Sequence, residues 1–406
     1  MSHARTLVVV GAGLAGAKAA EGARAHGFDG RILLVGEETR HPYERPSLSK
    51  QGLRGEESVP TYVHDEAFYA EHAIELLTWK RVASLDVAAR RIQLDSCAPV
   101  PFDTAVLATG AAPRTLNVPG SDLQGVHYLR TAEDAVALGA AIRGAGRVAI
   151  IGAGWIGTEV AASARQMGAS VVLIDPLEVP LQRVLGRRVG EVFAQLHADH
   201  GVELRLGRAV TGLSGQDRVS AVGLGDGSIE PADVVVVGIG ALPRVDLARE
   251  AGLAVAGGVV VDQYLETSAA GIYAAGDIAE ALHPVLGRRL RVEHWANARN
   301  QGLTAGGNAA GAREAYTRLP YFFSDQFDLG MEYVGHGSPD DEVVIRGDIS
   351  ARKFIAFWLR AGRVTAAMNV NVWDVVEDLK ALVASQRQVA PEHLADAALG
   401  LGSLVS

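Results

Sequence analysis

The sequence predicts an α/β protein in which two similar βαβ units are followed by a smaller α+β domain. The first unit spans Thr6–Glu38 and reads as strand, glycine turn, helix and strand. The second spans Arg147–Glu178 and repeats this order, with its glycines 141 positions later. From Pro320 onward the composition changes to clustered aromatic residues, strand-like segments and one helical stripe. Together these observations predict two parallel sheets and a third, mixed domain.

The turn of the first unit carries glycines in the spacing that admits a pyrophosphate. The short apolar run Leu7–Val10 suits a strand buried on both faces. Gly11 allows the tight turn, Gly13 lets backbone N–H groups approach phosphates, and Gly16 lets the helix pack on the strand. Glu37, 21 residues past Gly16, is placed to hydrogen-bond a ribose hydroxyl. Glycine turns of this pattern often bind nothing, but strand, helix and acid in register predict a Rossmann-like dinucleotide site.

The second unit predicts a second dinucleotide. Gly152, Gly154 and Gly157 repeat the glycine spacing, and Asp175 follows 18 residues past Gly157. FAD and a nicotinamide nucleotide are the natural pair for two adjacent sites. Asp175 would accept hydrogen bonds from a 2′-hydroxyl but repel a 2′-phosphate, and the nearest downstream base, Arg183, is eight residues away. We therefore predict NADH over NADPH.

The repeat extends beyond the glycine turns. Buried strands are expected at 102–110 and 232–240, and each is followed by Ala-x-Pro-Arg, at 111–114 and 241–244. Asp277 follows a further strand, at a position where α/β sheets bind ligands and where a helix N-cap would also suit an aspartate. The predicted division is an FAD-binding domain at 1–111 and 242–319, a NAD-binding domain at 112–241 and an α+β domain at 320–406.

Composition excludes several classes of function. The 406 residues carry a net charge of −9, which argues against bulk attraction to nucleic acid or to an anionic membrane. Cys97 is the single cysteine, so no intrachain disulfide, CxxC pair or cysteine metal cluster can form, which fits a reducing cytoplasm. No apolar run approaches about 18 residues, and we expect neither a transmembrane helix nor a targeting segment.

Three further segments support the organisation. Residues 39–60 are expected to be irregular, and Lys50 there could project toward a flavin ring or belong to a solvated surface loop. Thr131 is expected to cap a helix that has Glu133 and Asp134 in its first turn. A stripe of apolar residues between Val372 and Val383 recurs at helical spacing and predicts a packing face.

Eight motifs together resemble the NADH-dependent ferredoxin reductase family, which includes putidaredoxin reductase and the reductase components of aromatic-ring dioxygenases. They are VVGAGLAG, YERPSLSK, LATGAAPR, YLRTAED, IIGAGWIGTEVAA, GIYAAGD, EHWANA and FFSDQFD. The resemblance covers nearly the whole chain and implies a glutathione-reductase-like fold with an FAD domain and a NAD domain. It also implies electron transfer from NADH through FAD to a [2Fe–2S] ferredoxin that feeds a haem monooxygenase or a ring-hydroxylating dioxygenase.

The resemblance also implies roles for individual residues. The implied FAD contacts are Gly11, Gly13, Ala15, Gly16, Glu37, Arg45, Lys50, Val82, Ala108, Arg130, Asp277 and Trp295. The implied NADH contacts are Gly152, Gly154, Ile156, Gly157, Asp175, Arg183 and Gly240. Lys50 and Glu159 are the expected catalytic residues, with Glu159 near the nicotinamide and paired with Lys50. This chain departs from the family in having Asp175 where Glu is frequent and Phe323 where Trp is common.

The resemblance also implies a docking surface for an acidic ferredoxin. Candidate basic residues are Arg288, Arg289, Arg291, Arg299 and Arg313, each of which could equally be an ordinary solvated charge. A flavin NADH oxidase or quinone reductase, or an interaction role like that of apoptosis-inducing flavoproteins, stays open. Disulfide reductases need a cysteine pair, and oxidase or peroxidase relatives usually carry a cysteine beside the flavin, whereas Ser47–Lys50 contains none.

Overall fold

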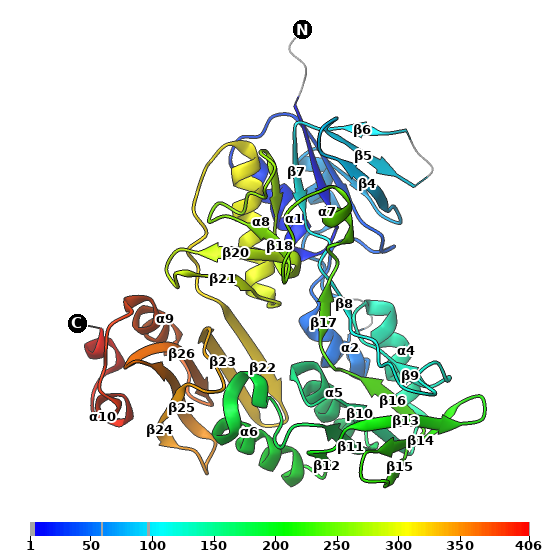
Figure 1. The fold of residues 1–406 in the computed structure, drawn as a ribbon, viewed down its shortest axis with the longest axis vertical. Helices are drawn as coiled ribbons and strands as arrows, with labels where there is room; N and C mark the ends of the chain where they lie inside the picture. The colour runs from blue at the N-terminus through cyan, green and yellow to red at the C-terminus, as the bar shows by residue number, and fades with distance from the viewer. Residues whose placement is uncertain (1–4, 58–59, 96–97, 406) are drawn as a thin grey trace. The chain divides into compact units, whose positions relative to one another are not determined.

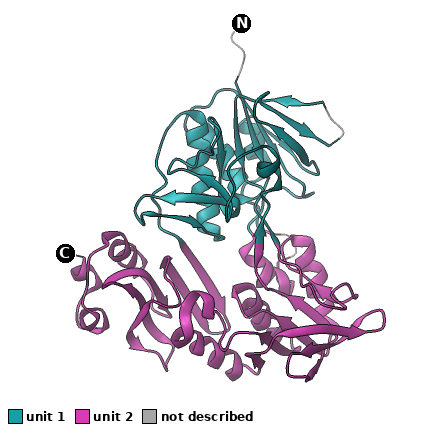
Figure 2. Cartoon of the chain, viewed as in Figure 1, with its two compact units in different colours: residues 1–44, 61–112, 242–320 teal, residues 45–60, 113–241, 321–406 magenta. Residues whose placement is uncertain are grey.

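The computed structural model describes residues 5–57, 60–95 and 98–405, so Cys97 lies outside the described residues. The chain forms two compact units, drawn in different colours in Figure 2. The first unit comprises residues 1–44, 61–112 and 242–320, and the second comprises 45–60, 113–241 and 321–406. The segment 45–60, which carries Lys50, thus belongs to the second unit.

A five-stranded sheet forms the centre of the first unit. In order across the sheet its strands are β19 (Ile272–Ala274), β7 (Thr104–Leu107), β1 (Thr6–Val10), β2 (Arg31–Val35) and β3 (Ile74–Leu77). All neighbouring strands are parallel, as the buried apolar runs predict. Leu7, Val8 and Val9 are fully buried in the core of this unit.

Helices α1 (Leu14–Ala25) and α8 (Trp295–Ala310) lie side by side next to this sheet (Figure 1). Their backbones approach too closely for larger side chains, because a Cβ at Gly306 would lie 1.9 Å from the carbonyl oxygen of Ala19. The remaining elements of the unit are β4 (Val82–Asp86), β5 (Arg91–Leu94), β6 (Val100–Pro101), α3 (Glu66–Glu71), α7 (Asp246–Glu250), β18 (Val259–Val261), η2 (Gly276–Ile278), β20 (Ala279–His283) and β21 (Arg288–Arg291).

The second unit repeats this design. Its parallel sheet has the order β12 (Glu203–Leu206), β11 (Ser170–Asp175), β10 (Arg147–Ile151), β16 (Val234–Val237) and β9 (Val126–His127). Its helices are η1 (Pro46–Ser49), α2 (Gln51–Arg54), α4 (Ala132–Arg143), α5 (Trp155–Gln166) and α6 (Gln182–Asp199). An antiparallel sheet comprises β13 (Val210–Gly215), β14 (Val219–Leu224) and β15 (Ile229–Pro231).

The expected cap of α4 is confirmed. The Thr131 hydroxyl accepts a hydrogen bond from the Asp134 backbone N–H at 3.1 Å, and the Asp134 carboxylate accepts one from the Thr131 N–H at 2.8 Å. This capping box satisfies donors that helix formation leaves unpaired.

The C-terminal part of the second unit is an antiparallel sheet with short helices. Its strands follow the order β22 (Tyr321–Gln326), β23 (Leu329–Gly335), β26 (Arg363–Val370), β25 (Lys353–Arg360) and β24 (Glu342–Asp348). Its helices are α9 (Val376–Ser385), α10 (Pro391–Ala395) and η3 (Leu401–Leu404). The α+β prediction is confirmed. In the helical stripe Leu379, Leu382 and Val383 are buried, whereas Val372 and Val375 precede α9, which therefore begins later than the spacing suggested.

This antiparallel sheet shares a core with α6. Leu185 and Phe193 on α6 belong to the same buried cluster as Phe322 and Trp358 on the sheet. The two Ala-x-Pro-Arg segments contribute strands β8 (Ala111–Pro113) and β17 (Ala241–Pro243) to a two-stranded sheet. None of the described helices is both long and apolar enough to span a bilayer.

Candidate functional site

Residues predicted to bind the first dinucleotide follow four neighbouring strands of the first unit. Gly11 and Ala108 come directly after β1 and β7, while Glu37 and Asp277 lie two and three residues beyond β2 and β19. Because these strands are parallel and adjacent, their carboxyl ends meet at one edge of the sheet. Open α/β sheets bind ligands at this edge.

The first glycine turn has the shape of a phosphate cradle. Gly11 has φ +110°, and a Cβ there would lie 2.2 Å from the Ala108 carbonyl oxygen. A Cβ at Gly16 would lie 1.8 Å from the Gly11 carbonyl oxygen, so only glycine fits. In contrast, none of the described atoms lies within 4 Å of a Cβ built at Gly13, which caps the N-terminus of α1. The helix N-terminus therefore faces open space that suits an anionic pyrophosphate.

The Glu37 carboxylate lies beside two arginines that the sequence does not single out. Arg244 Nη2 is 2.8 Å and Arg81 Nε is 3.5 Å from its oxygens. Arg244 belongs to the second Ala-x-Pro-Arg segment but lies in the first unit with Glu37. These contacts fix the carboxylate at the sheet edge where a ribose would bind.

The other residues expected at FAD divide between the two units. Ala15 lies in α1, Val82 begins β4, and Trp295 begins α8, where its indole N–H donates to the Glu44 carboxylate. All of these lie in the first unit. Arg45, Lys50 and Arg130 lie in the second unit, where the Arg45 guanidinium donates to the Arg130 carbonyl.

The second glycine turn reproduces the first. Gly152 has φ +102°, and a Cβ there would lie 2.4 Å from the Gly238 carbonyl oxygen. A Cβ at Gly157 would lie 1.8 Å from the Gly152 carbonyl oxygen, whereas a Cβ at Gly154 would meet no described atom within 4 Å. Gly154 caps α5, and its open position again suits a pyrophosphate.

The residues expected at NADH all lie in the second unit. Gly240 has φ +110° and follows β16, so it shares the sheet edge with Gly152 and Asp175. Ile156 lies in the first turn of α5 with 45% of its surface exposed, and Arg183 is exposed near the start of α6. The structure thus brings the second predicted set to one edge.

Asp175 is held by the backbone next to the glycine turn. Its Oδ2 accepts a hydrogen bond from the Ala153 N–H at 2.7 Å, and its Oδ1 accepts one from the Leu177 N–H at 2.8 Å. The carboxylate therefore has a fixed orientation at the end of β11, which is the position of a ribose-binding acid.

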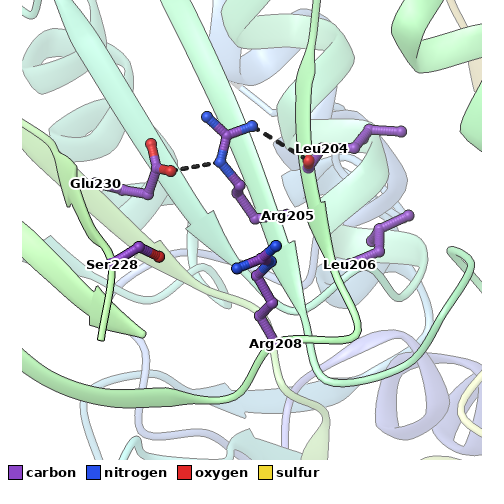
Figure 3. A pocket seen from close by; sticks show the side chains of 6 residues that line it. All are labelled: Leu204, Arg205, Leu206, Arg208, Ser228 and Glu230. Atoms are coloured by element: carbon purple, nitrogen blue, oxygen red, sulfur yellow. Dashed lines mark hydrogen bonds and ion pairs between the residues drawn. The ribbon is translucent and has the colours of Figure 1, made fainter. Parts of the chain in front are cut away.

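A pocket lies along the neighbouring strand β12 (Figure 3). It is lined by Leu204, Arg205, Leu206, Arg208, Ser228 and Glu230. Leu206 pairs with Asp175 in the sheet, and the Arg208 N–H donates to the Asp175 carbonyl at 3.0 Å. The Arg205 guanidinium pairs with Glu230, and Arg208 pairs with Asp226. The pocket's positive charges are therefore already matched by carboxylates.

Lys50 and Glu159 form the ion pair that the resemblance implies. Lys50 follows η1 and Glu159 lies in α5, and the Lys50 Nζ is 2.9 Å from the Glu159 Oε1. Both residues are buried. The Lys50 Nζ also lies 5.9 Å from the centre of the Phe323 ring. The pairing is confirmed, and the catalytic role stays a prediction.

The family comparison covers almost the whole chain. Residues 5–302 match the pyridine nucleotide-disulphide oxidoreductase family, and residues 321–405 match the reductase C-terminal family. The chain is 39% identical to the ferredoxin–NAD(+) reductase component of the anthranilate 1,2-dioxygenase system of Burkholderia cepacia, over 97% of this chain and 98% of that protein. It is 35% identical to rhodocoxin reductase of Rhodococcus erythropolis, over 96% and 92% of the two chains.

Solved structures agree with the sequence comparison. The ferredoxin reductase for the CYP199A2 system from Rhodopseudomonas palustris superimposes with a TM-score of 0.95, at 35% identity, over 99% of this chain and 100% of that one. The covalent putidaredoxin reductase–putidaredoxin complex gives a TM-score of 0.94, at 34% identity, over 99% and 98%. With two glycine cradles and a matching C-terminal part, the chain belongs to the NADH-dependent ferredoxin reductase family of pyridine nucleotide-disulphide oxidoreductases.

Proposed function

We propose that this protein takes two electrons from NADH through bound FAD and passes them one at a time to a [2Fe–2S] ferredoxin that serves an oxygenase. In the balanced reaction, NADH and two oxidised ferredoxins give NAD⁺, one proton and two reduced ferredoxins. The observation that carries the proposal is the pair of open glycine cradles at Gly13 and Gly154, one in each unit. Relatives named as ferredoxin–NAD(+) reductase components of dioxygenase systems support the choice of acceptor and of oxygenase.

FAD, when bound, supplies the chemistry that accepts a hydride and releases electrons singly. The cradle at Gly11, Gly13 and Gly16 would hold it, with Glu37 on a ribose. The positive charge of Lys50 would favour the negative charge that reduction adds to the flavin, and Glu159 would hold the Lys50 ammonium in place. No side chain need act as a nucleophile.

The second cradle would hold NADH in preference to NADPH. The Asp175 carboxylate would accept hydrogen bonds from a 2′-hydroxyl and repel a 2′-phosphate. Arg208, the arginine whose backbone contacts Asp175, is paired with Asp226 and so offers a phosphate little net positive charge.

The ferredoxin would dock on basic residues of the first unit. Arg288, Arg289 and Arg291 share strand β21, and Arg299 lies in the second turn of α8. Arg313 lies beyond the far end of α8, whose last residue, Ala310, is about 16 Å along the helix axis from Arg299. The Arg291 guanidinium pairs with Glu293, which reduces its charge toward a partner. We place the patch at the β21 arginines and Arg299, which lie on one strand and near the start of the helix that follows it. A cytoplasmic location belongs to the same proposal and rests on the single cysteine.

The proposal is tested by following the acceptor directly. The FAD-loaded protein, reduced with one equivalent of NADH without oxygen, is mixed with oxidised [2Fe–2S] ferredoxin, and bleaching of the iron–sulfur absorbance is recorded. The proposal predicts two ferredoxins reduced per NADH, at a rate that falls steeply with salt. Arg299→Glu should slow the reaction more than Arg313→Glu. A reduced protein that leaves ferredoxin oxidised would refute the proposed function, and a flat salt profile would refute the basic patch.

A further inference from the structure

A chain of buried hydrogen bonds reaches Glu159 from the C-terminal sheet of the second unit. We propose that Ser324 and Gln326 are positioning residues for the NADH half of the reaction, because they hold the Glu159 carboxylate, and through it the Lys50 ammonium, in one orientation. This inference rests on the proposed function, since only there do Lys50 and Glu159 act on the cofactors. Ser324 and Gln326 lie in β22, 165 and 167 positions along the chain from Glu159.

The Glu159 carboxylate accepts three hydrogen bonds. The Ser324 hydroxyl donates to its Oε1 at 2.7 Å, and the Lys50 ammonium contacts the same oxygen at 2.9 Å. The Ser49 hydroxyl donates to the other oxygen, Oε2. Lys50, Ser49 and Ser324 are all buried with Glu159, so the carboxylate depends on these donors.

The direction of the Ser324 hydroxyl is set by Gln326. The Gln326 amide Nε2 lies 3.2 Å from the Ser324 Oγ and 3.0 Å from the Thr158 Oγ1. An amide N–H donates only, so the serine oxygen accepts from Gln326 and its own proton is directed to Glu159. Gln326 therefore orients the Ser324 hydroxyl that donates to Glu159, although Gln326 does not contact Glu159 in this network.

The contact with Thr158 orients the Gln326 amide. The Thr158 hydroxyl donates its proton to the backbone carbonyls of Gly154 and Trp155 at the start of its own helix. Its oxygen must therefore accept the hydrogen bond from Gln326. On the other side, the Gln326 Oε1 lies 2.9 Å from the His197 Nε2. The Thr158 contact requires the amide nitrogen to face Thr158 and Ser324, and the amide oxygen therefore faces His197.

His197 supplies the required donor through the single proton of its neutral ring. Burial lowers its pKa to about 4, so near pH 7 the ring carries one proton. The His197 Nδ1 has no hydrogen-bond partner among the described residues, whereas its Nε2 faces the Gln326 oxygen. The proton therefore belongs on Nε2, and the chain runs in one direction from His197 through Gln326 and Ser324 to Glu159.

Side chains alternate between the two faces of β22, and this alternation places Ser324 and Gln326 on the face that contacts α5. Phe322, Ser324 and Gln326 are buried, while Phe323 and Asp325 between them are exposed. A strand with two polar residues on its buried face is unusual unless those residues have partners, and here both contribute to one network. The C-terminal sheet thereby supplies part of the support for the Lys50–Glu159 pair.

The test compares Ser324→Ala with Ser163→Ala. Ser163 is as buried as Ser324, but its hydroxyl bonds the Ser49 carbonyl at 2.6 Å and does not touch Glu159. The FAD-loaded variants are mixed with NADH and with 4-deuterated NADH without oxygen, and the limiting rate of flavin reduction and the Kd for NADH are measured. We expect Ser324→Ala to lower the limiting rate about tenfold and raise its isotope effect, with a Kd change below about twofold.

Two more variants separate positioning from mere folding. Ser324→Thr keeps the hydroxyl and should restore the limiting rate to within about twofold of the wild type. Gln326→Met should slow reduction in the wild-type background but add little to Ser324→Ala, because both changes act through one bond. Wild-type rates in Ser324→Ala, equal slowing in Ser163→Ala, or additive effects of the two changes would overturn the inference. This assay measures flavin reduction by NADH and contains no ferredoxin. If the protein failed to reduce ferredoxin, the proposed function would be refuted, but the comparison of Ser324→Ala with Ser163→Ala would still test the positioning role.

Discussion

The Nζ of Lys50 lies 2.9 Å from the Oε1 of Glu159, and both side chains are buried in the second unit. Removing one partner leaves the buried charge of the other without its counter-ion. We expect Lys50→Met or Glu159→Gln to lower the free energy of unfolding by about 3–5 kcal/mol. The double variant should cost less than the sum, because no lone charge remains. Urea unfolding of the four proteins measures this, and additive losses would contradict the pairing.

Gly13→Ala and Gly154→Ala form a matched pair of variants. Both positions have extended backbone and open space, so alanine should fold with little change in Tm. Each methyl group would nevertheless occupy the place of a pyrophosphate. Gly13→Ala should lose FAD, whereas Gly154→Ala should retain FAD and raise the Kd for NADH by at least about tenfold. As a contrast, Gly16→Ala should fail to fold, because its Cβ would lie 1.8 Å from the Gly11 carbonyl oxygen. FAD content and NADH titration measure both effects. Loss of FAD in Gly154→Ala, or full FAD content with weakened NADH binding in Gly13→Ala, would contradict the assignment of the two cradles.

The choice between NADH and NADPH is testable at Asp175 and Asp226. Asp175→Asn removes the charge that repels a 2′-phosphate and keeps one oxygen, which can accept one of the two backbone hydrogen bonds. Asp226→Asn frees the positive charge of Arg208. Each change should lower the ratio of kcat/KM with NADH to kcat/KM with NADPH, and for Asp175→Asn the decrease should be roughly tenfold. An unchanged ratio in Asp175→Asn would refute the role given to that carboxylate.

The buried His197 should lower the free energy of unfolding in acid. Its pKa in the folded protein is lowered to about 4 by burial, below its value in the unfolded chain. Between those two pKa values the unfolded chain binds a proton that the folded protein does not, so stability falls as pH falls. Relative to His197→Gln, the wild type should lose about 2 kcal/mol between pH 7 and pH 5. Urea unfolding of both proteins at the two pH values gives the difference, and parallel profiles would contradict it.

Local sequence signals predicted the parts of the fold that depend on neighbouring residues. The glycine spacings, the buried strands and the capping box at Thr131 all appear where the sequence places them. The apolar spacing between Val372 and Val383 does not itself mark where α9 begins, and the helix starts at Val376. The α+β character of the C-terminal part followed from strand-like segments and is confirmed.

Long-range packing decided what the sequence left open. Ser324 contacts Glu159 across 165 positions, and Arg244 contacts Glu37 across 207 positions, and no local sequence pattern predicts either contact. Arg208 lies beside Asp175 because β11 and β12 are neighbours in the sheet, whereas the sequence suggested only Arg183 as the nearest base. The grouping of 45–60 with the second unit likewise depends on tertiary contacts.

The most direct test of the central claim is NADH-driven reduction of cytochrome c, measured with and without a [2Fe–2S] ferredoxin, with NADH loss in air as background. An electron-transfer reductase should reduce cytochrome c slowly alone and many times faster once ferredoxin is added, with little oxygen consumption. Gly154→Ala should abolish the increase at low NADH concentrations. Rapid NADH loss that ferredoxin does not change would contradict the account and assign the protein to the oxidases or small-acceptor reductases.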